Sequence, residues 1–211
     1  MVTDLRRLCG DATSLGERRR RAVALAAAAS AAGVDLIQVR ERDLDAQALT
    51  LLVQDIVDAC RDTATRVVVN ERVDVAIAAG AHGVHLRGDS LTARDVRRLV
   101  PPAFLVGRSV HRLSECRDAG PVDYLIAGAV FPTSSKPDGH PLLSLSDLGA
   151  MATAAEVPVL AIGGVTPARL GLLAATGVSG VAGIGLFSGP VALDQVSAAI
   201  RAAFDTPQPA P

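Results

Sequence analysis

The chain has 211 residues, of which 49% are hydrophobic and 20% are charged, and its formal net charge is −1. This balance, the lack of a long basic block and an aromatic content of only 2% argue against nucleic acid or a membrane surface as partners. The longest apolar run, Ala22–Val34, is too short and too weakly hydrophobic to span a bilayer. Three widely spaced cysteines without a CxxC pair suggest reduced thiols, and the start of the chain has no signal-peptide pattern, so we expect a cytoplasmic protein.

Short β-rich runs alternate with longer helical patterns along the chain. The predicted strands are Leu36–Arg40, Arg66–Asn70, Val84–Arg87, Phe104–Ser109, Tyr124–Ala129, Val159–Ile162 and Gly180–Ile184. The predicted helices are Gly16–Ala32, Asp45–Asp62, Val73–Ala79, Thr92–Val100, Leu113–Asp118, Ser144–Ala155, Pro167–Thr176 and Leu193–Phe204. This alternation predicts parallel strands joined by helical crossovers, in an α/β fold.

An eighth strand is needed to complete a barrel, and Met1–Leu5 is the candidate, although it is short or truncated. With it, the pattern predicts a single (β/α)8 TIM barrel over residues 1–204, followed by a disordered Pro-rich tail over 205–211. An open doubly wound sheet is the competing architecture. No GxGxxG motif follows the first predicted strand, which favours the barrel.

Polar residues end four consecutive predicted strands, where the active site of a barrel lies. Side-chain alternation places them in four inward-facing groups: Gln38, Arg40 and Arg42; Asn70; His85 and Arg87; Ser109 and His111. We interpret His85 as a core histidine with satisfied hydrogen bonds. His111 follows Ser109 at the end of its strand and is the candidate general acid or base.

The last three predicted strands end in loops that suit a bound anion. The loop after the strand at 124–129 is rich in hydroxyl groups and contains Lys136, the single lysine of the chain, which could close over a ligand. Gly163 and Gly164 follow the next strand, and Ile184 and Gly185 follow the last one. Barrels often bind phosphate at these two loops, through backbone N–H groups. No His, Cys and Asp spacing predicts a metal site.

Six segments together resemble the thiamine-phosphate synthase/TenI superfamily, from about Val2 to Ser188. They are Gln38–Arg42, Asn70–Asp74, Gly83–Leu86, Gly107–His111, Val130–Lys136 and Ala161–Pro167. The resemblance implies a (β/α)8 barrel and a small-molecule thiazole phosphate as the substrate. Homo-oligomerisation is left open.

The superfamily has two branches, and the intact Gly107–His111 string resembles the TenI branch, thiazole tautomerase. That resemblance implies an isomerase without a cofactor, in which His111 moves a proton and aromatises the carboxylated thiazole phosphate. Gly163, Gly164, Ile184 and Gly185 would hold the phosphate. The predicted substrate-binding residues are Arg40, Asn70, Ser109, Thr133, Ser135 and Lys136, of which Arg40 with Asn70 or Lys136 would hold the carboxylate.

Two alternatives stay open. One is the synthase branch, a Mg²⁺-dependent transferase that joins a pyrimidine diphosphate to the thiazole phosphate. Its two metal-binding aspartates correspond to Glu71 and Ser90 here, with Asp89 one residue before, and these changes argue against a Mg²⁺ site. The other alternative is a non-catalytic protein that binds a phosphorylated ligand.

Overall fold

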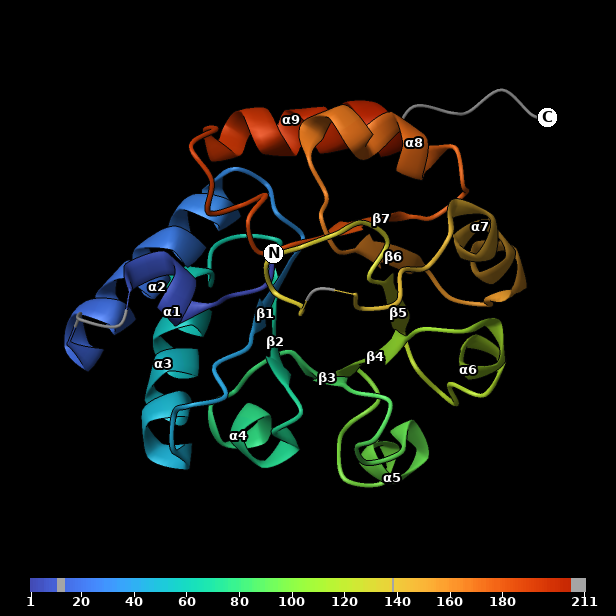
Figure 1. Ribbon diagram of the computed structural model, residues 1–211. Helices are drawn as coiled ribbons and strands as arrows, with labels where there is room; N and C mark the ends of the chain where they lie inside the picture. The colour runs from blue at the N-terminus through green and yellow to red at the C-terminus, as the bar shows by residue number, and fades with distance from the viewer. Residues whose placement is uncertain (11–13, 138, 206–211) are drawn as a thin grey trace.

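The structure is a computed structural model that describes residues 1–10, 14–137 and 139–205 (Figure 1). Within these residues, seven parallel strands lie side by side in the order of the sequence. They are β1 (Leu36–Val39), β2 (Arg66–Asn70), β3 (Gly83–Leu86), β4 (Leu105–Val110), β5 (Tyr124–Gly128), β6 (Val159–Ile162) and β7 (Gly180–Ala182). The predicted strands are therefore confirmed to within two residues at each end.

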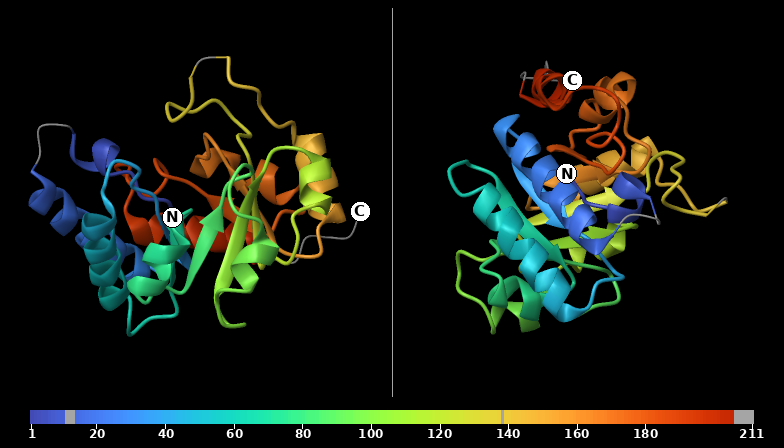
Figure 2. Two further views of the ribbon diagram at one scale, coloured as in Figure 1. Left: turned by 90° about the horizontal axis from the view of Figure 1, so that it is seen from below. Right: turned by 90° about the vertical axis from the view of Figure 1, so that its left-hand side faces the viewer.

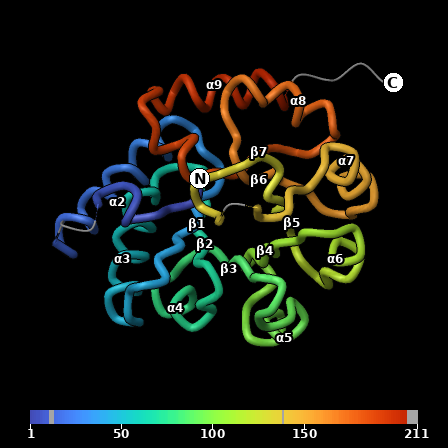
Figure 3. The backbone as a smooth tube through the Cα atoms, in the orientation of Figure 1, coloured from blue at the N-terminus to red at the C-terminus, as the bar shows by residue number. Residues whose placement is uncertain are grey.

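Helices surround the curled sheet, as the ribbon and the backbone tube both show (Figures 1 and 3). They are α1 (Leu5–Cys9), α2 (Leu15–Ala31), α3 (Ala46–Ala59), α4 (Val73–Ala78), α5 (Ala93–Arg97), α6 (Leu113–Arg117), α7 (Leu145–Ala154), the 3-10 turn η1 (Pro167–Arg169), α8 (Leu170–Ala174) and α9 (Leu193–Phe204). The Asp45 carboxylate accepts from the N–H of Ala48 and so caps α3. None of the helices in the described part of the chain is long and apolar enough to cross a membrane.

The prediction that Met1–Leu5 forms the eighth strand is wrong in the second half of that segment. Val2 makes a single parallel bridge with Gln38, and its N–H donates to the carbonyl of Gly183 over 2.9 Å. This short segment lies between β1 and the end of β7, where the chain start is labelled in Figure 1. The extended run then ends because the carboxylate of Asp4 accepts from the N–H of Arg7 and caps α1. The TIM-barrel fold is confirmed, with its eighth strand reduced to a bridge.

The core has two parts. The larger one lies between the sheet and the helices and includes the fully buried Ile37, Leu52 and Leu125. The smaller one lies around Tyr124, Ile126 and Ala182, on the opposite faces of their strands. This small apolar layer lies inside the barrel, and polar side chains occupy the upper end of the interior.

The predicted single domain over 1–204 agrees with one continuous sheet, and we retain it as a proposal. Of the predicted disordered tail, residues 206–211 lie outside the described part of the chain.

Candidate functional site

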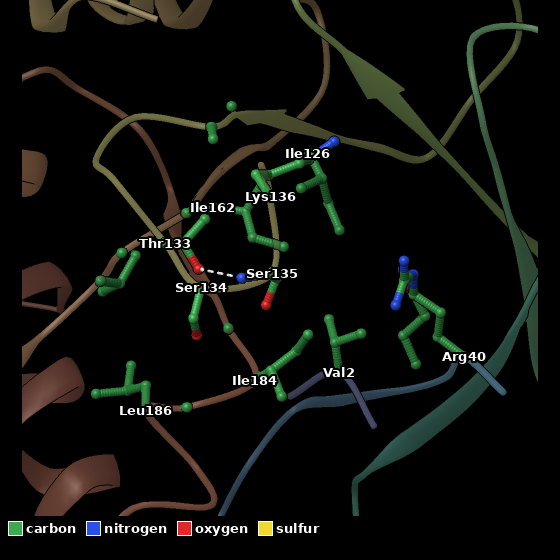
Figure 4. A pocket seen from close by; sticks show the side chains of 18 of the residues that line it. Val2, Arg40, Ile126, Thr133, Ser134, Ser135, Lys136, Ile162, Ile184 and Leu186 are labelled. Atoms are coloured by element: carbon green, nitrogen blue, oxygen red, sulfur yellow. Dashed lines mark hydrogen bonds between the residues drawn. The ribbon is translucent and has the colours of Figure 1, made fainter. Parts of the chain in front are cut away.

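A cavity of about 580 Å³ opens at the carboxyl ends of the strands (Figure 4). All of the predicted site residues line it: Arg40, Asn70, Ser109, His111, Thr133, Ser135, Lys136, Gly163, Gly164, Ile184 and Gly185. These residues come from six strand ends that are far apart in the sequence. Arg40 lies across the cavity from Thr133 and Ser134, with Val2 and Ile184 between them in the view (Figure 4).

The cavity is strongly cationic. Six basic side chains line it, namely Arg7, Arg40, Arg42, Arg87, Lys136 and Arg169, whereas no Asp or Glu does so among the described residues. Arg40 is half-buried, and burial lowers the pKa of its guanidinium, with the nearby charges of Arg42 and Arg87 adding to the effect. Like charges at this density are costly in a partly buried site, so the cavity is built to receive a polyanion.

The buried side chains of His85 and Tyr124 lie below the cavity wall, where His85 supports the side chain of Ser109. The His85 ring is 2% exposed, and its Nδ1 lies 3.2 Å from the hydroxyl of Tyr124. Burial lowers the pKa of His85 to about 3 and raises the pKa of Tyr124, so both side chains are neutral at pH 7. Gly107 makes this arrangement possible, since a Cβ at that position would lie 2.1 Å from the Tyr124 ring. The interpretation of His85 as a satisfied core histidine is confirmed.

His111 lies at the cavity edge just beyond β4. Its Nδ1 is within hydrogen-bond distance of the carbonyl oxygen of Gly128. A carbonyl can only accept, so Nδ1 carries the hydrogen in the neutral ring and Nε2 keeps its lone pair. The backbone N–H of His111 also donates to the Glu115 carboxylate over 2.7 Å. This tautomer enables His111 to accept a proton at Nε2.

The two glycine-rich loops present backbone donors to the cavity. Among the described residues, the N–H groups of Gly164, Val165, Gly185 and Leu186 donate no hydrogen bond to another protein atom. All four residues line the cavity. Free N–H groups at adjacent strand ends are suited to an anion such as phosphate. After β7 the chain makes a single turn from Ile184 to Ser188, and the predicted helix follows as α9 from Leu193.

Arg169 fixes the first of these loops. Its guanidinium donates to the Gly164 carbonyl over 2.5 Å and lies 4.4 Å from the ring centre of Phe131. Gly164 has φ +60°, and a Cβ there would lie 2.4 Å from the carbonyl oxygen of Pro132. The tight backbone therefore requires glycine at this position.

The loop after β5 stands above the strand ends, where Figure 2 shows it in yellow. The hydroxyl of Thr133 accepts from the N–H of Ser135 over 3.3 Å, the bond drawn in Figure 4. Arg7 of α1 donates to the hydroxyl of Ser134 over 2.7 Å and so joins the chain start to this loop. Arg7 and Arg169 are missing from the predicted site, because their contacts with Ser134 and Phe131 connect segments that no local pattern relates.

The carboxylates nearest the cavity do not fit a divalent cation. Glu71 and Asp89 both form ion pairs with Arg87, at 3.3 and 2.9 Å. No group of three or more His, Cys, Asp or Glu side chains in the described part of the chain is arranged to hold a metal. The Arg87 guanidinium already pairs with both carboxylates that such an ion would need as ligands.

Comparison with known proteins points to one family. Residues 11–187 match the TMP-TENI family model, described as thiamine monophosphate synthase. A thiamine-phosphate synthase of Laribacter hongkongensis is 43% identical over 58% of this chain, and the match spans 59% of its own length, less than two thirds. One from Methanoculleus marisnigri is 40% identical over 68% of each chain.

Solved structures agree with these sequence matches. Thiamine phosphate pyrophosphorylase from Pyrococcus furiosus superposes with a TM-score of 0.80 at 27% identity, over 97% of this chain and 93% of that one. A 3-hexulose-6-phosphate synthase superposes with a TM-score of 0.66 at 20% identity, over 88% of this chain and 94% of that one. The second likeness concerns the fold alone.

Proposed function

Because the chain belongs to the TMP-TENI family of thiamine biosynthesis enzymes, we propose that it catalyses the coupling reaction of a thiamine-phosphate synthase. The sequence alone places the tautomerase first, whereas the names of the relatives favour the synthase. In the proposed reaction, the thiazole nitrogen bonds to the methylene carbon of a pyrimidine diphosphate. The bond from that carbon to the diphosphate oxygen breaks, and pyrophosphate leaves with the electron pair.

The charge of the cavity carries this proposal. Six cationic side chains face a volume of about 580 Å³, and within the described residues only Arg87 of the six forms ion pairs, with Glu71 and Asp89. A phosphate monoester carries about two negative charges near neutral pH, so a diphosphate and a monophosphate together carry about five. A carboxylated thiazole phosphate alone brings about three. The pair of phosphorylated substrates therefore matches the cavity more closely than the single one.

The two ends of the cavity suggest how the substrates bind. The free N–H groups of Gly164 and Gly185 would hold the thiazole phosphate. Arg40, Arg42 and Arg87, which follow β1 and β3, would hold the diphosphate and stabilise the charge that builds up as it leaves. Ser109, held by His85, lies between these groups along the sheet and can donate to either substrate. Asn70, Thr133, Ser135 and Lys136 complete the proposed binding set.

A direct assay tests the proposal. Purified protein is mixed with the pyrimidine diphosphate and the thiazole phosphate, and thiamine phosphate and pyrophosphate are measured in parallel. We expect equal amounts of both products. Release of neither product, in buffers with and without Mg²⁺, would reject the synthase.

The geometry of His111 supports thiazole tautomerase as a second candidate. With Nδ1 bound to the Gly128 carbonyl, Nε2 is a base at the cavity edge. It would take a proton from ring carbon C2, and the exocyclic carbon would receive one as the ring becomes aromatic. Conversion of the tautomer, followed by its absorbance, tests this activity separately from coupling.

A further inference from the structure

We propose that the guanidinium of Arg87 takes the place of a divalent cation in this cavity, so that arginines alone bind the diphosphate end of the substrate. The inference rests on the proposed coupling function. It concerns a difference between this chain and the pattern of the synthase branch: here the side chain of Arg87, a fixed cation, pairs with the two carboxylates beside the strand ends.

The hydrogen bonds of Arg87 hold its side chain at the cavity wall. Nη1 lies 3.3 Å from one oxygen of Glu71, and the Arg87 backbone N–H donates to the other oxygen over 3.3 Å. Nη2 donates to Asp89 over 2.9 Å. A guanidinium carries five N–H donors, so this arrangement leaves three for a ligand. Arg87 thus connects two carboxylates to the cavity, as a bound cation would.

Glu71 is held in place to receive this guanidinium. Its φ is +66°, and it is the only non-glycine residue with positive φ among the described residues. The Glu71 N–H donates to the carbonyl of His85 over 2.9 Å, which fixes the turn between β2 and α4 against β3. A left-handed conformation is unfavourable for glutamate, so the surrounding structure imposes it.

The neighbouring arginines form no direct ion pair within the described residues, although the charges of Asp4 and Glu41 act on Arg40 from nearby. In the described part of the chain, Arg40 and Arg42 have no ion-pair partner, although both line the cavity. Together with Arg87 they form a group of three guanidinium ions on one side. Guanidinium forks bind phosphate oxygens in bidentate geometry, which supplies the charge and orientation otherwise given by a metal.

Binding of inorganic pyrophosphate, measured by calorimetry in buffer with EDTA, tests the inference. We expect wild-type protein to bind pyrophosphate without a divalent cation. Arg87→Met should weaken binding at least about tenfold, the usual effect of losing a charge-assisted hydrogen bond, and Arg87→Lys should retain part of the affinity. Arg98→Met is the matched control, because Arg98 forms an exposed ion pair with Asp95 outside the cavity.

Glu71→Gln separates the arginine site from a metal site. If Arg87 binds the anion itself, removal of the Glu71 charge frees the guanidinium and should keep or increase pyrophosphate affinity in EDTA. If a metal binds there, the same change removes a ligand and weakens the affinity measured with Mg²⁺ in place of EDTA. The inference is overturned by pyrophosphate binding that requires Mg²⁺, or by unchanged affinity in a folded Arg87→Met variant.

The coupling assay keeps this result apart from the proposed function. Arg87-dependent binding of pyrophosphate in EDTA supports the arginine site even if the protein couples no substrates. In that case only the proposed synthase function is rejected. Coupling that proceeds only with Mg²⁺ supports the synthase and overturns the arginine site.

Discussion

The Nε2 atom of His85 lies 2.9 Å from the hydroxyl oxygen of Ser109, so a buried ring is joined to a side chain of the cavity wall. On its other side the ring meets Tyr124, with the two rings stacked at 5.6 Å. The hydroxyl of Ser109 therefore has a fixed position and a neutral partner. Protonation of His85 would place an unpaired charge in the barrel interior, and this cost gives the first prediction.

We expect His85 to make the protein less stable in acid. Its pKa is lowered to about 3 in the folded state, whereas an unfolded histidine titrates near pH 6.5. Between these values the unfolded chain binds more protons, so the free energy of unfolding falls as pH drops, by up to about 1.4 kcal/mol per pH unit. Urea unfolding of wild type and His85→Gln from pH 7 to 4 measures the difference. Parallel pH curves for the two proteins would contradict the prediction.

The second prediction concerns Gly164, in the loop after β6 that is proposed to hold the thiazole phosphate. Gly164→Ala combines two penalties, a positive φ and a Cβ 2.4 Å from the Pro132 carbonyl. Gly80→Ala is the matched control, because Gly80 has φ +67° with no atom within 4 Å of the added Cβ. We expect the control to lose about 1 kcal/mol of stability and Gly164→Ala to lose clearly more, with weaker binding of thiazole phosphate.

Urea unfolding and a binding titration measure the two effects. Equal losses of stability in Gly164→Ala and Gly80→Ala would show that the loop adapts to the extra atom. Unchanged thiazole phosphate affinity in a folded Gly164→Ala protein would remove this loop from the proposed phosphate site.

The sequence predicted the sheet and most of the cavity wall because both follow from local patterns. Buried runs such as Val67–Val69 identify strands, and alternation along them places Arg40 and Ser109 on the inner face. The start of the chain was harder, because a five-residue helix has too few turns to show a period. There the decisive feature is the Asp4 cap, which hydrophobic periodicity does not reveal.

Contacts between distant segments account for the other omissions. Arg7 reaches Ser134 across 127 positions of the chain, which no spacing rule relates. Arg87 was placed inward by alternation with His85, but its pairing with Glu71 depends on the register of β2 against β3. The sequence shows the changed residues Glu71 and Ser90, whereas the ion pair of Arg87 with Glu71, on which our proposal rests, is seen only in the structure.

Lys136 tests whether the loop after β5 contributes to binding. Lys136 lines the cavity, and we expect Lys136→Ala to raise KM about tenfold while kcat changes less than about threefold, since a flexible surface charge contributes mainly to substrate binding. Lys136→Arg keeps the charge and should remain near wild type. A fall in kcat without a change in KM would instead assign Lys136 to the chemical step.

His111 separates the two candidate activities. Its neutral ring carries the hydrogen on Nδ1, bound to the Gly128 carbonyl, and presents Nε2 as a base. Coupling of the two substrates requires no proton transfer from carbon, so His111→Gln should change the coupling rate less than about tenfold. Any tautomerase activity should fall by roughly 10²–10⁴-fold, the usual contribution of a general acid or base.

Both reactions are measured on the same preparation of His111→Gln, with His140→Gln as the matched control. His140 lies in the loop after β5 and does not line the cavity, so its removal should leave both rates unchanged. A loss of coupling as large as the loss of tautomerisation would mean that His111 serves the synthase reaction directly. A rate of tautomerisation equal to wild type would remove His111 from that mechanism, and with it the observation that favours the second candidate.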